Sequence, residues 1–439
     1  MSFRRHQNLS DESQASSSLC SDVKLTNQLS AQLDSNFNEF VESQLPQDLS
    51  AAEILMEVLS PHSTTSMASS FGNFHQSQHA STTGYRVIGF GQCGLVFERP
   101  GRGYVVKAAK PAYELALWND FRAHFNVGQA FQKEGLSIEC RVPRIFSYVR
   151  KDNREWWDEN RPLFSDVHES LPLPAMVLVT ERILPLPKVA RQALVNTYCP
   201  PALRPTVSAS PANRDCLARL YLGRRRRANA PLSPNFSLRN FNMFVDQIFD
   251  LNLPANLFAS AMGEALAVIH WSANVDAYDV EFVLGSEGDI MYNRDVSIAL
   301  NLTAEKVAAM APHTDLDNMM SVNFRQRTTR LWVLDFNLCN VWEEKVGWES
   351  PDALISHLVM AFFENDPYYP LPLTELDEDR QLWETFCASY VDKGTQILSA
   401  PGKDRRLIHL PRKFIEACVN REKQNLDQGL GHGHREFKE

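Results

Sequence analysis

Apolar and polar positions follow two different rhythms in the stretch AMGEALAVIHWSANVDAYDVEFVL, which spans residues 261–284. Apolar residues recur three and four positions apart up to Trp271, as on one face of a helix. They then cluster in the short β-favouring segment Glu281–Leu284. The stretch therefore predicts a helix, a turn and a strand, and two acidic residues, Asp276 and Glu281, flank the junction between helix and strand.

The pattern between residues 85 and 188 predicts strands around one long helix. The segment YRVIGFGQCGLVFERPGRGYVVKAAK reads as a β-hairpin, because apolar residues continue as a strand after its glycines and Pro100–Gly103 turns the chain. A dinucleotide-binding fold would instead need a helix directly after the glycines. The further predicted elements are a helix over Tyr113–Lys133, a strand over Arg141–Val149, a loop over 150–172 and a buried strand over Met176–Val179.

The second half of the chain predicts mostly helices, interrupted by two inserts. Residues 189–240 are irregular and proline-rich, and residues 285–329 are acidic and polar. A buried strand over Leu331–Leu334 follows the second insert and ends at Asp335. The predicted helices cover Phe241–Leu251, Leu257–Trp271, Leu354–Phe363, Asp379–Leu398 and Pro411–Gln428.

These elements predict an α+β protein with two lobes. The residues before the body are rich in Ser, Gln, Asn and Thr and cannot bury enough apolar surface to fold, except for a helix near 50–60 with a capping box of Ser50 and Glu53. Whether that helix docks on the body or on a partner stays open. We expect a largely disordered extension over 1–80, a small antiparallel-sheet lobe over 81–188, a helical lobe over 189–400, and a C-terminal helix with a disordered tail over 401–439.

Composition and charge exclude several classes of protein. The chain has 439 residues, of which 44% are hydrophobic and 22% charged, and this suffices for a substantial core. A net charge of −9 argues against a protein that binds nucleic acid over its whole surface. No apolar run reaches membrane-spanning length and the first residues lack the apolar region of a secretory signal. We therefore expect no membrane partner and a cytoplasmic or nuclear location.

Eight cysteines are scattered along the chain without a C-x-x-C pair or the Cys/His spacing of a zinc finger. We expect reduced, mostly packed thiols and no zinc site. A run of four arginines at 224–227 is compatible with a solvated face, a nuclear-import signal or a patch for an anionic substrate.

Gly89, Gly91 and Gly94 form a G-x-G-x-x-G pattern in the hairpin, and Lys107 ends its second strand. This order resembles the glycine-rich loop and strand lysine of protein kinases, in which the loop covers the phosphates of ATP and the lysine holds the α- and β-phosphates. The resemblance implies an acid on the following helix that pairs with the lysine, and Asp120 is the better candidate. An ordinary glycine-rich hairpin with a solvated edge lysine is the alternative.

The rest of the kinase order follows downstream. Glu181 lies in the segment that corresponds to the connector whose backbone meets adenine. Asp276 and Glu281 are offset by five residues (281 − 276 = 5), like the catalytic Asp and metal-binding Asn of kinases, and Asp335 opens Asp-Phe-Asn in place of Asp-Phe-Gly. The resemblance therefore implies Asp276 as catalytic base, Glu281 and Asp335 as ligands of Mg²⁺, and ATP as the nucleotide.

Five runs of residues are similar to a fungal family of uncharacterised function that is often labelled a zinc finger protein. They are CLARLYLGRRRR, FSLRNFNMF, ALAVIHWSANVDAYDVEFVLG, LWVLDFNLCNVW and AFFENDPYYPLP, and the resemblance covers about residues 85–400. The chain departs from working kinases at two positions: no His-Arg-Asp triplet precedes the base, and Glu281 stands where kinases have Asn.

Three functions are compatible with this sequence. The first is a kinase-like domain that binds Mg-ATP, with phosphotransfer to a small molecule, because no Ala-Pro-Glu motif follows Asp335 as in protein kinases. The second is a catalytically inactive, pseudokinase-like module that binds a protein partner. The third, nucleic-acid binding through the arginine run, is disfavoured by the acidic balance of the chain.

Overall fold

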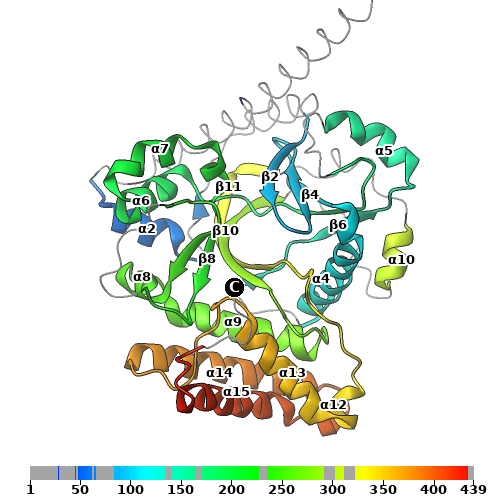
Figure 1. Ribbon diagram of the computed structural model, residues 1–439, viewed down its shortest axis with the longest axis vertical. Helices are drawn as coiled ribbons and strands as arrows, with labels where there is room; N and C mark the ends of the chain where they lie inside the picture. The colour runs from blue at the N-terminus through cyan, green and yellow to red at the C-terminus, as the bar shows by residue number, and fades with distance from the viewer. Residues whose placement is uncertain are drawn as a thin grey trace, which may run out of the picture.

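The computed structural model describes residues 28, 45, 48–61, 64–65, 84–134, 140–164, 171–226, 235–290, 302–310 and 322–433, without the side chains of 289–290 and 322–326. Most of the predicted extension over 1–80 and the end of the predicted tail, with His434, lie outside these residues. The described part is α+β, as the sequence predicts, with two sheets and a helical layer (Figure 1).

A five-stranded antiparallel sheet contains the glycine-rich hairpin. Its strand order is β2 (Arg86–Phe90), β3 (Gly94–Glu98), β4 (Tyr104–Ala109), β7 (Val177–Glu181) and β6 (Ile145–Val149). The long helix α4 (Glu114–Glu134) packs on this sheet, because its Phe121 and Phe125 are buried against Tyr148 and Leu178. The sheet therefore carries Lys107 on an inner strand, with α4 beside it.

A second, six-stranded sheet lies beside the first. Its order is β1 (Thr64–Thr65), β11 (Val322–Leu334), β10 (Glu281–Ile290), β8 (Ala218–Tyr221) and β9 (Phe241–Phe244), and β5 (Cys140–Arg141) pairs in parallel with β11. In the antiparallel β10–β11 pair, Glu281 lies opposite Leu334. This register brings Glu281 next to Asp335, the residue after β11.

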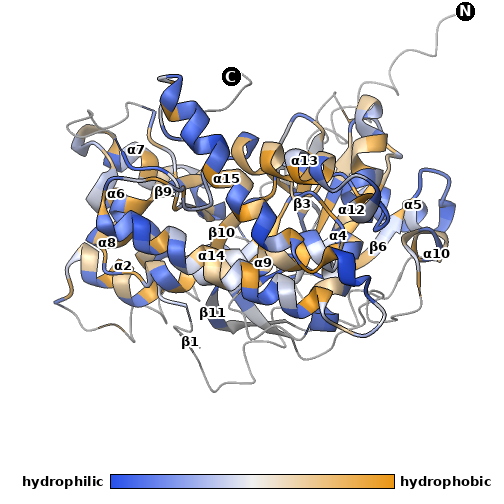
Figure 2. Ribbon diagram, turned by 90° about the horizontal axis from the view of Figure 1, so that it is seen from below, coloured by the Kyte–Doolittle hydropathy of each residue, from blue (hydrophilic) through white to orange (hydrophobic). Residues whose placement is uncertain are grey.

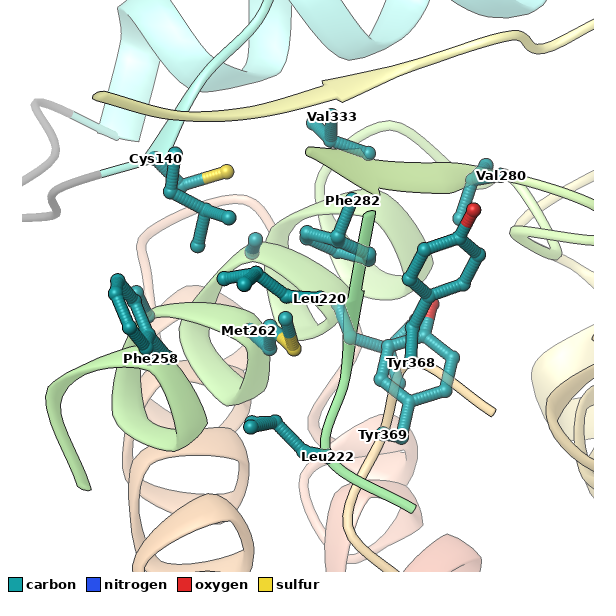
Figure 3. Packing of buried hydrophobic residues seen from close by; sticks show 14 of the residues in the cluster. Cys140, Leu220, Leu222, Phe258, Met262, Val280, Phe282, Val333, Tyr368 and Tyr369 are labelled. Atoms are coloured by element: carbon teal, nitrogen blue, oxygen red, sulfur yellow. The ribbon is translucent and has the colours of Figure 1, made fainter. Parts of the chain in front are cut away.

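The helical layer is built around α9 (Ala255–Trp271), which is buried along almost its whole length. Gly263 of α9 allows a close approach to α14 (Asp377–Leu398), since a Cβ at this position would lie 2.5 Å from the Phe386 carbonyl oxygen. Figure 3 shows Met262 of α9 packed near Leu220 and Phe282 of the second sheet. The further helices here are α8 (Val245–Asp250), α12 (Val346–Glu349), α13 (Pro351–Glu364) and α15 (Leu410–Asp427), and α14 and α15 carry both hydrophilic and hydrophobic residues (Figure 2).

The helix predicted near 50–60 is α2 (Ala51–Leu59), and it docks on the body. Ser50 and Glu53 form the capping box, and Leu55 and Leu59 are fully buried in the main core beside α6 (Lys188–Tyr198; Figure 1). This part of residues 1–80 is therefore an ordered element of the fold, because its apolar face finds a partner helix.

Two segments predicted to be irregular contain regular structure. Residues 150–172 include α5 (Arg154–Asn160), in which Asn153 caps the helix and two adjacent tryptophans are buried. Residues 189–240 contain α6, α7 (Arg204–Ala209) and β8, so the insert is part of the body. Prolines obscured these helices in the sequence, because here they occupy first-turn positions, where proline is tolerated.

Two other predicted elements have different bounds or a different type. Residues 241–244 form β9 rather than the start of a helix, with Phe241 and Met243 buried and Asn242 exposed in strand alternation. The predicted strand 141–149 divides into β5 and β6, which belong to different sheets. The polar insert 285–329 extends β10 and β11 and includes α10 (Ala304–Ala309).

Candidate functional site

Lys107 joins three elements through two ion pairs. Its Nζ lies 2.6 Å from Oδ2 of Asp120 on α4 and 2.9 Å from Oδ1 of Asp335 after β11. Burial alone would lower the pKa of Lys107, but the negative charges of Asp120 and Asp335, and the hydrogen bonds to them, raise it above its usual value. The lysine is therefore a permanent cation at the meeting point of β4, α4 and the end of β11.

Helix α4 also fixes the backbone that follows Asp335. Oδ1 of Asp120 accepts a hydrogen bond from the Phe336 amide (3.1 Å), and the Phe336 ring is fully buried with its centroid 5.0 Å from that of His124. Asp335 adopts a left-handed conformation (φ 63°), and 36% of its side chain is exposed. An acid with a left-handed backbone and a part-exposed side chain, held next to a partly buried lysine, is typical of a functional position.

The three hairpin glycines are placed differently. A Cβ on Gly94 would lie 2.3 Å from the Ala108 carbonyl oxygen, and one on Gly89 would lie 2.9 Å from the Cβ of Val96, so both glycines are required by packing within the sheet. A Cβ on Gly91 would meet nothing closer than 3.8 Å. The turn between β2 and β3, here called the glycine-rich turn, is tied to the site, because the Asn337 side-chain amide lies 3.5 Å from the Cys93 sulfur.

Glu281, the first residue of β10, is held by an arginine that the sequence analysis did not single out. Arg219 of β8 donates a hydrogen bond to Oε1 of Glu281. Burial raises the pKa of Glu281 to about 7, with the nearby charge of Asp335 adding to the rise and that of Arg219 opposing it. Glu281 thus lies near Asp335, but its carboxylate is already paired with the Arg219 cation.

Asp276 is fully buried and its oxygens are engaged. It accepts hydrogen bonds from the backbone and side-chain amides of Asn340 (2.8 and 2.9 Å), from the Tyr278 amide (3.1 Å) and from Nε2 of His357 on α13 (2.8 Å). Burial would raise the pKa of Asp276, but these hydrogen bonds lower it below its usual value. A carboxylate enclosed in this way is a structural anchor and offers no open oxygen to a substrate. Asp279, three residues on, is exposed.

Glu181 is likewise used within the protein. Its carboxylate accepts two hydrogen bonds from the Arg144 guanidinium (2.8 and 2.9 Å), and its amide donates to the Arg144 carbonyl (2.8 Å). The next amide, of Arg182, donates to the Gly103 carbonyl (2.9 Å). These groups hold the sheet together, so they are not available to adenine.

Two cavities lie beside α4. One of about 440 Å³ is lined by residues of α4, β5 and β6 and by Glu181. The other, of about 550 Å³, lies between the start of α4, β6 and α10, and Glu114, Trp118 and Ala308 are among its lining residues.

Asp335 is the candidate metal ligand whose side chain is most open to solvent, since Asp276 is fully buried and Glu281 is 23% exposed. Asp335 offers a part-exposed carboxylate, and Mg²⁺ is commonly held by one or two carboxylates together with substrate phosphates. In the part of the chain that the structure describes, no three His, Cys, Asp or Glu side chains are grouped to hold a metal ion, and the seven described cysteines are unbridged thiols. No zinc site can therefore be assigned to these residues.

Two of the arginines at 224–227 are neutralised within the protein. Arg225 pairs with Asp379 (2.7 Å) and with Glu378, and Arg226 pairs with Asp246 (2.6 Å). Arg227 lies outside the described residues. Across the described ranges, no helix is long and apolar enough to cross a membrane.

One comparison with known proteins gives a match. A family model described as "Zinc finger protein", for a domain of unknown function, matches residues 331–402, which begin in β11, include Asp335 and end after α14. Neither a curated protein nor a solved structure matches the chain. The chain is thus similar to this family over the segment that carries Asp335, α13 and α14.

The sequence analysis missed three residues that complete the site: Arg219, Asn340 and His357. Arg219 lies in a segment interpreted as an irregular insert, and His357 lies on a helix far along the chain. The almost continuous apolar run around Arg219, in CLARLYL, is the signal that would have indicated a buried strand carrying a cation.

Proposed function

We propose that this protein is a two-lobed, kinase-like domain that binds a nucleotide together with Mg²⁺ between its small antiparallel sheet and its helical layer. The observation that carries the proposal is the ion-paired Lys107, which contacts Asp120 on the helix after its strand and Asp335 after β11. In kinases the strand lysine pairs with an acid of that helix, and the Asp of the later motif holds the metal.

The connectivity of the small sheet supports this proposal. Three antiparallel strands are followed by α4 and then by two further antiparallel strands, and the helix packs on the sheet beside Lys107. The β10–β11 pair places Glu281 and Asp335 side by side at the end of the second sheet. The order of these elements along the chain is the one that the kinase resemblance implies, and this agreement supports the proposal.

The proposed roles follow from the geometry. Lys107 would bind phosphate oxygens as a fixed cation, and Asp335 would hold Mg²⁺, whose charge offsets that of the phosphates. Gly91 would leave space for the nucleotide at the turn between β2 and β3. Gly89 and Gly94 are instead required for close packing between neighbouring strands. A guanine or adenine base would be held by residues other than Glu181, since that side chain is paired with Arg144.

A nucleotide-binding module without phosphotransfer is the version of this function that the site favours. Asp276 occupies the position of the catalytic base, but its side chain is fully buried and hydrogen-bonded to Asn340 and His357. A general base must reach the hydroxyl from which it takes a proton. Binding and interaction with a protein partner are therefore proposed ahead of transfer to a small molecule.

Thermal unfolding with and without ligands tests the proposal. The full chain is heated alone, with ATP, with Mg²⁺ and with both. A ligand at 100 times its dissociation constant adds about 2.7 kcal/mol of stability, so the melting temperature should rise by several degrees only when both are present. Lys107→Met should abolish this rise, whereas the control Lys413→Met, which removes a lysine paired with Asp352 elsewhere, should retain it. Absence of any rise at saturating ATP and Mg²⁺ would refute nucleotide binding.

A further inference from the structure

Asn119 joins α4 to the chain segment that follows Asp335. Its side-chain amide donates hydrogen bonds to the carbonyl oxygens of Asn337 (3.1 Å) and Cys339 (2.6 Å). The next residue of the helix, Asp120, accepts a hydrogen bond from the amide of the residue after Asp335 (3.1 Å). Two adjacent side chains of α4 therefore hold the same short segment, and the sequence analysis singled out only the second of them.

The segment 336–340 lies in neither a helix nor a strand, so its backbone groups need partners from elsewhere in the fold. Its far end is fixed by Asp276. The Asn340 amide donates to the Asp276 carboxylate (2.8 Å), and the Asp276 amide donates to the Asn340 carbonyl (3.0 Å). Asn119 thus supplies the donor for two carbonyls that lie between two fixed ends.

Asp335 stands directly before this segment in a backbone conformation that needs support. Its φ of 63° lies in the left-handed region, which residues other than glycine adopt at a cost and keep only where the surrounding structure fixes it. On one side the support is β11, whose last residue, Leu334, is paired with β10. On the other side it is the segment held by Asn119 and Asp120. The contact of the Asp335 carboxylate with Lys107 (2.9 Å) therefore depends on support from both sides.

We propose that Asn119 is a positioning residue, which holds the segment 336–340 against α4 and thereby keeps the Asp335 carboxylate on Lys107. It acts through two backbone carbonyls and requires no metal ion at the site. Because Asn119 and Asp120 lie on the same helix, a shift of α4 would release the segment and break the pair of Lys107 with Asp120 together. The consequence for a bound nucleotide rests on the proposed function, whereas the support of the ion pair does not.

Thiol labelling of the full chain tests whether Asn119 holds the segment. Asn119→Leu keeps the branched shape of the side chain and favours a helix, but it removes the donor. Cys339 is fully buried, so a thiol reagent reaches it only when this part of the chain opens. In Asn119→Leu, Cys339 should react about tenfold faster than in the unaltered chain, because bonds to two carbonyls are lost. Cys216, which is also fully buried, should react at an unchanged rate.

Double variants test whether Asn119 acts through Asp335. Asn119→Leu should lower the urea midpoint of the unaltered chain partly by weakening the pair of Lys107 with Asp335. The same substitution should therefore cause a smaller shift in an Asp335→Asn background, where that pair is already weakened. A hydrogen bond with a purely structural role would give the same shift in both backgrounds.

Gln129→Leu is the matched control, because Gln129 also donates from α4 to a distant carbonyl, that of Leu302 (3.4 Å). It should give equal shifts in the two backgrounds and unchanged labelling. In isothermal titration with ATP and Mg²⁺ together, Asn119→Leu should raise the dissociation constant about tenfold, because the phosphate-binding lysine loses part of its fixed surroundings. The control should bind as the unaltered chain does.

Three results would each overturn the inference in a folded Asn119→Leu variant. They are labelling of Cys339 that is unchanged or rises only in step with that of Cys216, equal urea shifts in the two backgrounds, and an unchanged dissociation constant. Should Asn119→Leu not unfold cooperatively, Asn119→Ala takes its place in every arm. Failure of the proposed function gives a different pattern: the unaltered chain binds no ATP, and the labelling and urea experiments still decide the role of Asn119.

Discussion

Asp335 and Asp276 are two aspartates predicted from the same motif order, and the fold gives them opposite environments. Asp335 is part-exposed, has a left-handed backbone and shares Lys107 with Asp120. Asp276 is fully buried and accepts hydrogen bonds from Asn340, Tyr278 and His357. The spacing of a motif thus brings a residue near a site. The burial of its side chain and its hydrogen-bond partners then decide whether it can bind a ligand or only stabilises the fold.

The largest expected effect is the difference in stability between variants of the two aspartates. Asp276→Asn should lower the free energy of unfolding by about 2–4 kcal/mol, because the new amide would face buried donors that lose their acceptor. Asp335→Asn should cost about 1 kcal/mol or less, since Lys107 keeps Asp120 and asparagine tolerates a left-handed backbone. Urea unfolding of both variants measures the difference, and equal costs would contradict the contrast.

The hairpin glycines offer the same contrast on a smaller scale. Gly94→Ala should destabilise the protein by about 1–3 kcal/mol, because its Cβ would overlap the Ala108 carbonyl. Gly91→Ala should change stability by about 0.5 kcal/mol or less, and it should weaken nucleotide binding if the glycine-rich turn meets phosphate. Chemical denaturation and nucleotide titration of the pair check both statements. A Gly91→Ala variant as unstable as Gly94→Ala would show that the glycine-rich turn also serves packing.

The smallest expected effect concerns the pH dependence of the Asp276 anchor. The hydrogen bond to Asp276 raises the pKa of His357 above its usual value, against the opposing effect of partial burial. The folded protein therefore keeps a proton on His357 that the unfolded chain releases near pH 6.5. The stability that His357 contributes is fully present below about pH 6.5 and is lost as the pH rises through the raised value.

Measured against His357→Asn, the unaltered protein should lose a few tenths of a kcal/mol between pH 6 and pH 8.5, a small amount because water screens the half-exposed ring. Urea unfolding at the two pH values gives this difference. A constant difference between the two proteins across this range would show that His357 does not titrate against Asp276.

Much of the local structure could be predicted from the sequence. The hairpin of β3 and β4, the long helix α4, α9 and the strand before Asp335 all follow from strong apolar periodicity with clear turn residues. The partnership of Lys107 with Asp120 was also expected, because the kinase resemblance implies an acid on the helix that follows the strand, and the 13-residue separation (120 − 107 = 13) leaves room for the turn between them.

The remaining features depend on contacts between distant segments. The hydrogen bond between His357 and Asp276 links residues 81 positions apart. The one between Arg219 and Glu281 links residues 62 positions apart. The five-residue offset between Asp276 and Glu281 reveals neither the burial of the Asp276 side chain nor the arginine that pairs with Glu281 from the neighbouring strand. Prolines at first-turn positions also hid helices such as α7, and a four-residue strand such as β9 is too short for its alternation to stand out from helical spacing.

The most direct test of the account is the melting temperature of Asp335→Asn and Asp276→Asn, each measured with and without ATP and Mg²⁺ together. We predict that Asp335→Asn melts close to the unaltered protein but no longer responds to the ligands. Asp276→Asn should melt at a lower temperature and still be stabilised by them. A ligand response lost in Asp276→Asn and kept in Asp335→Asn would contradict the account, because it would assign the ligand to the buried aspartate.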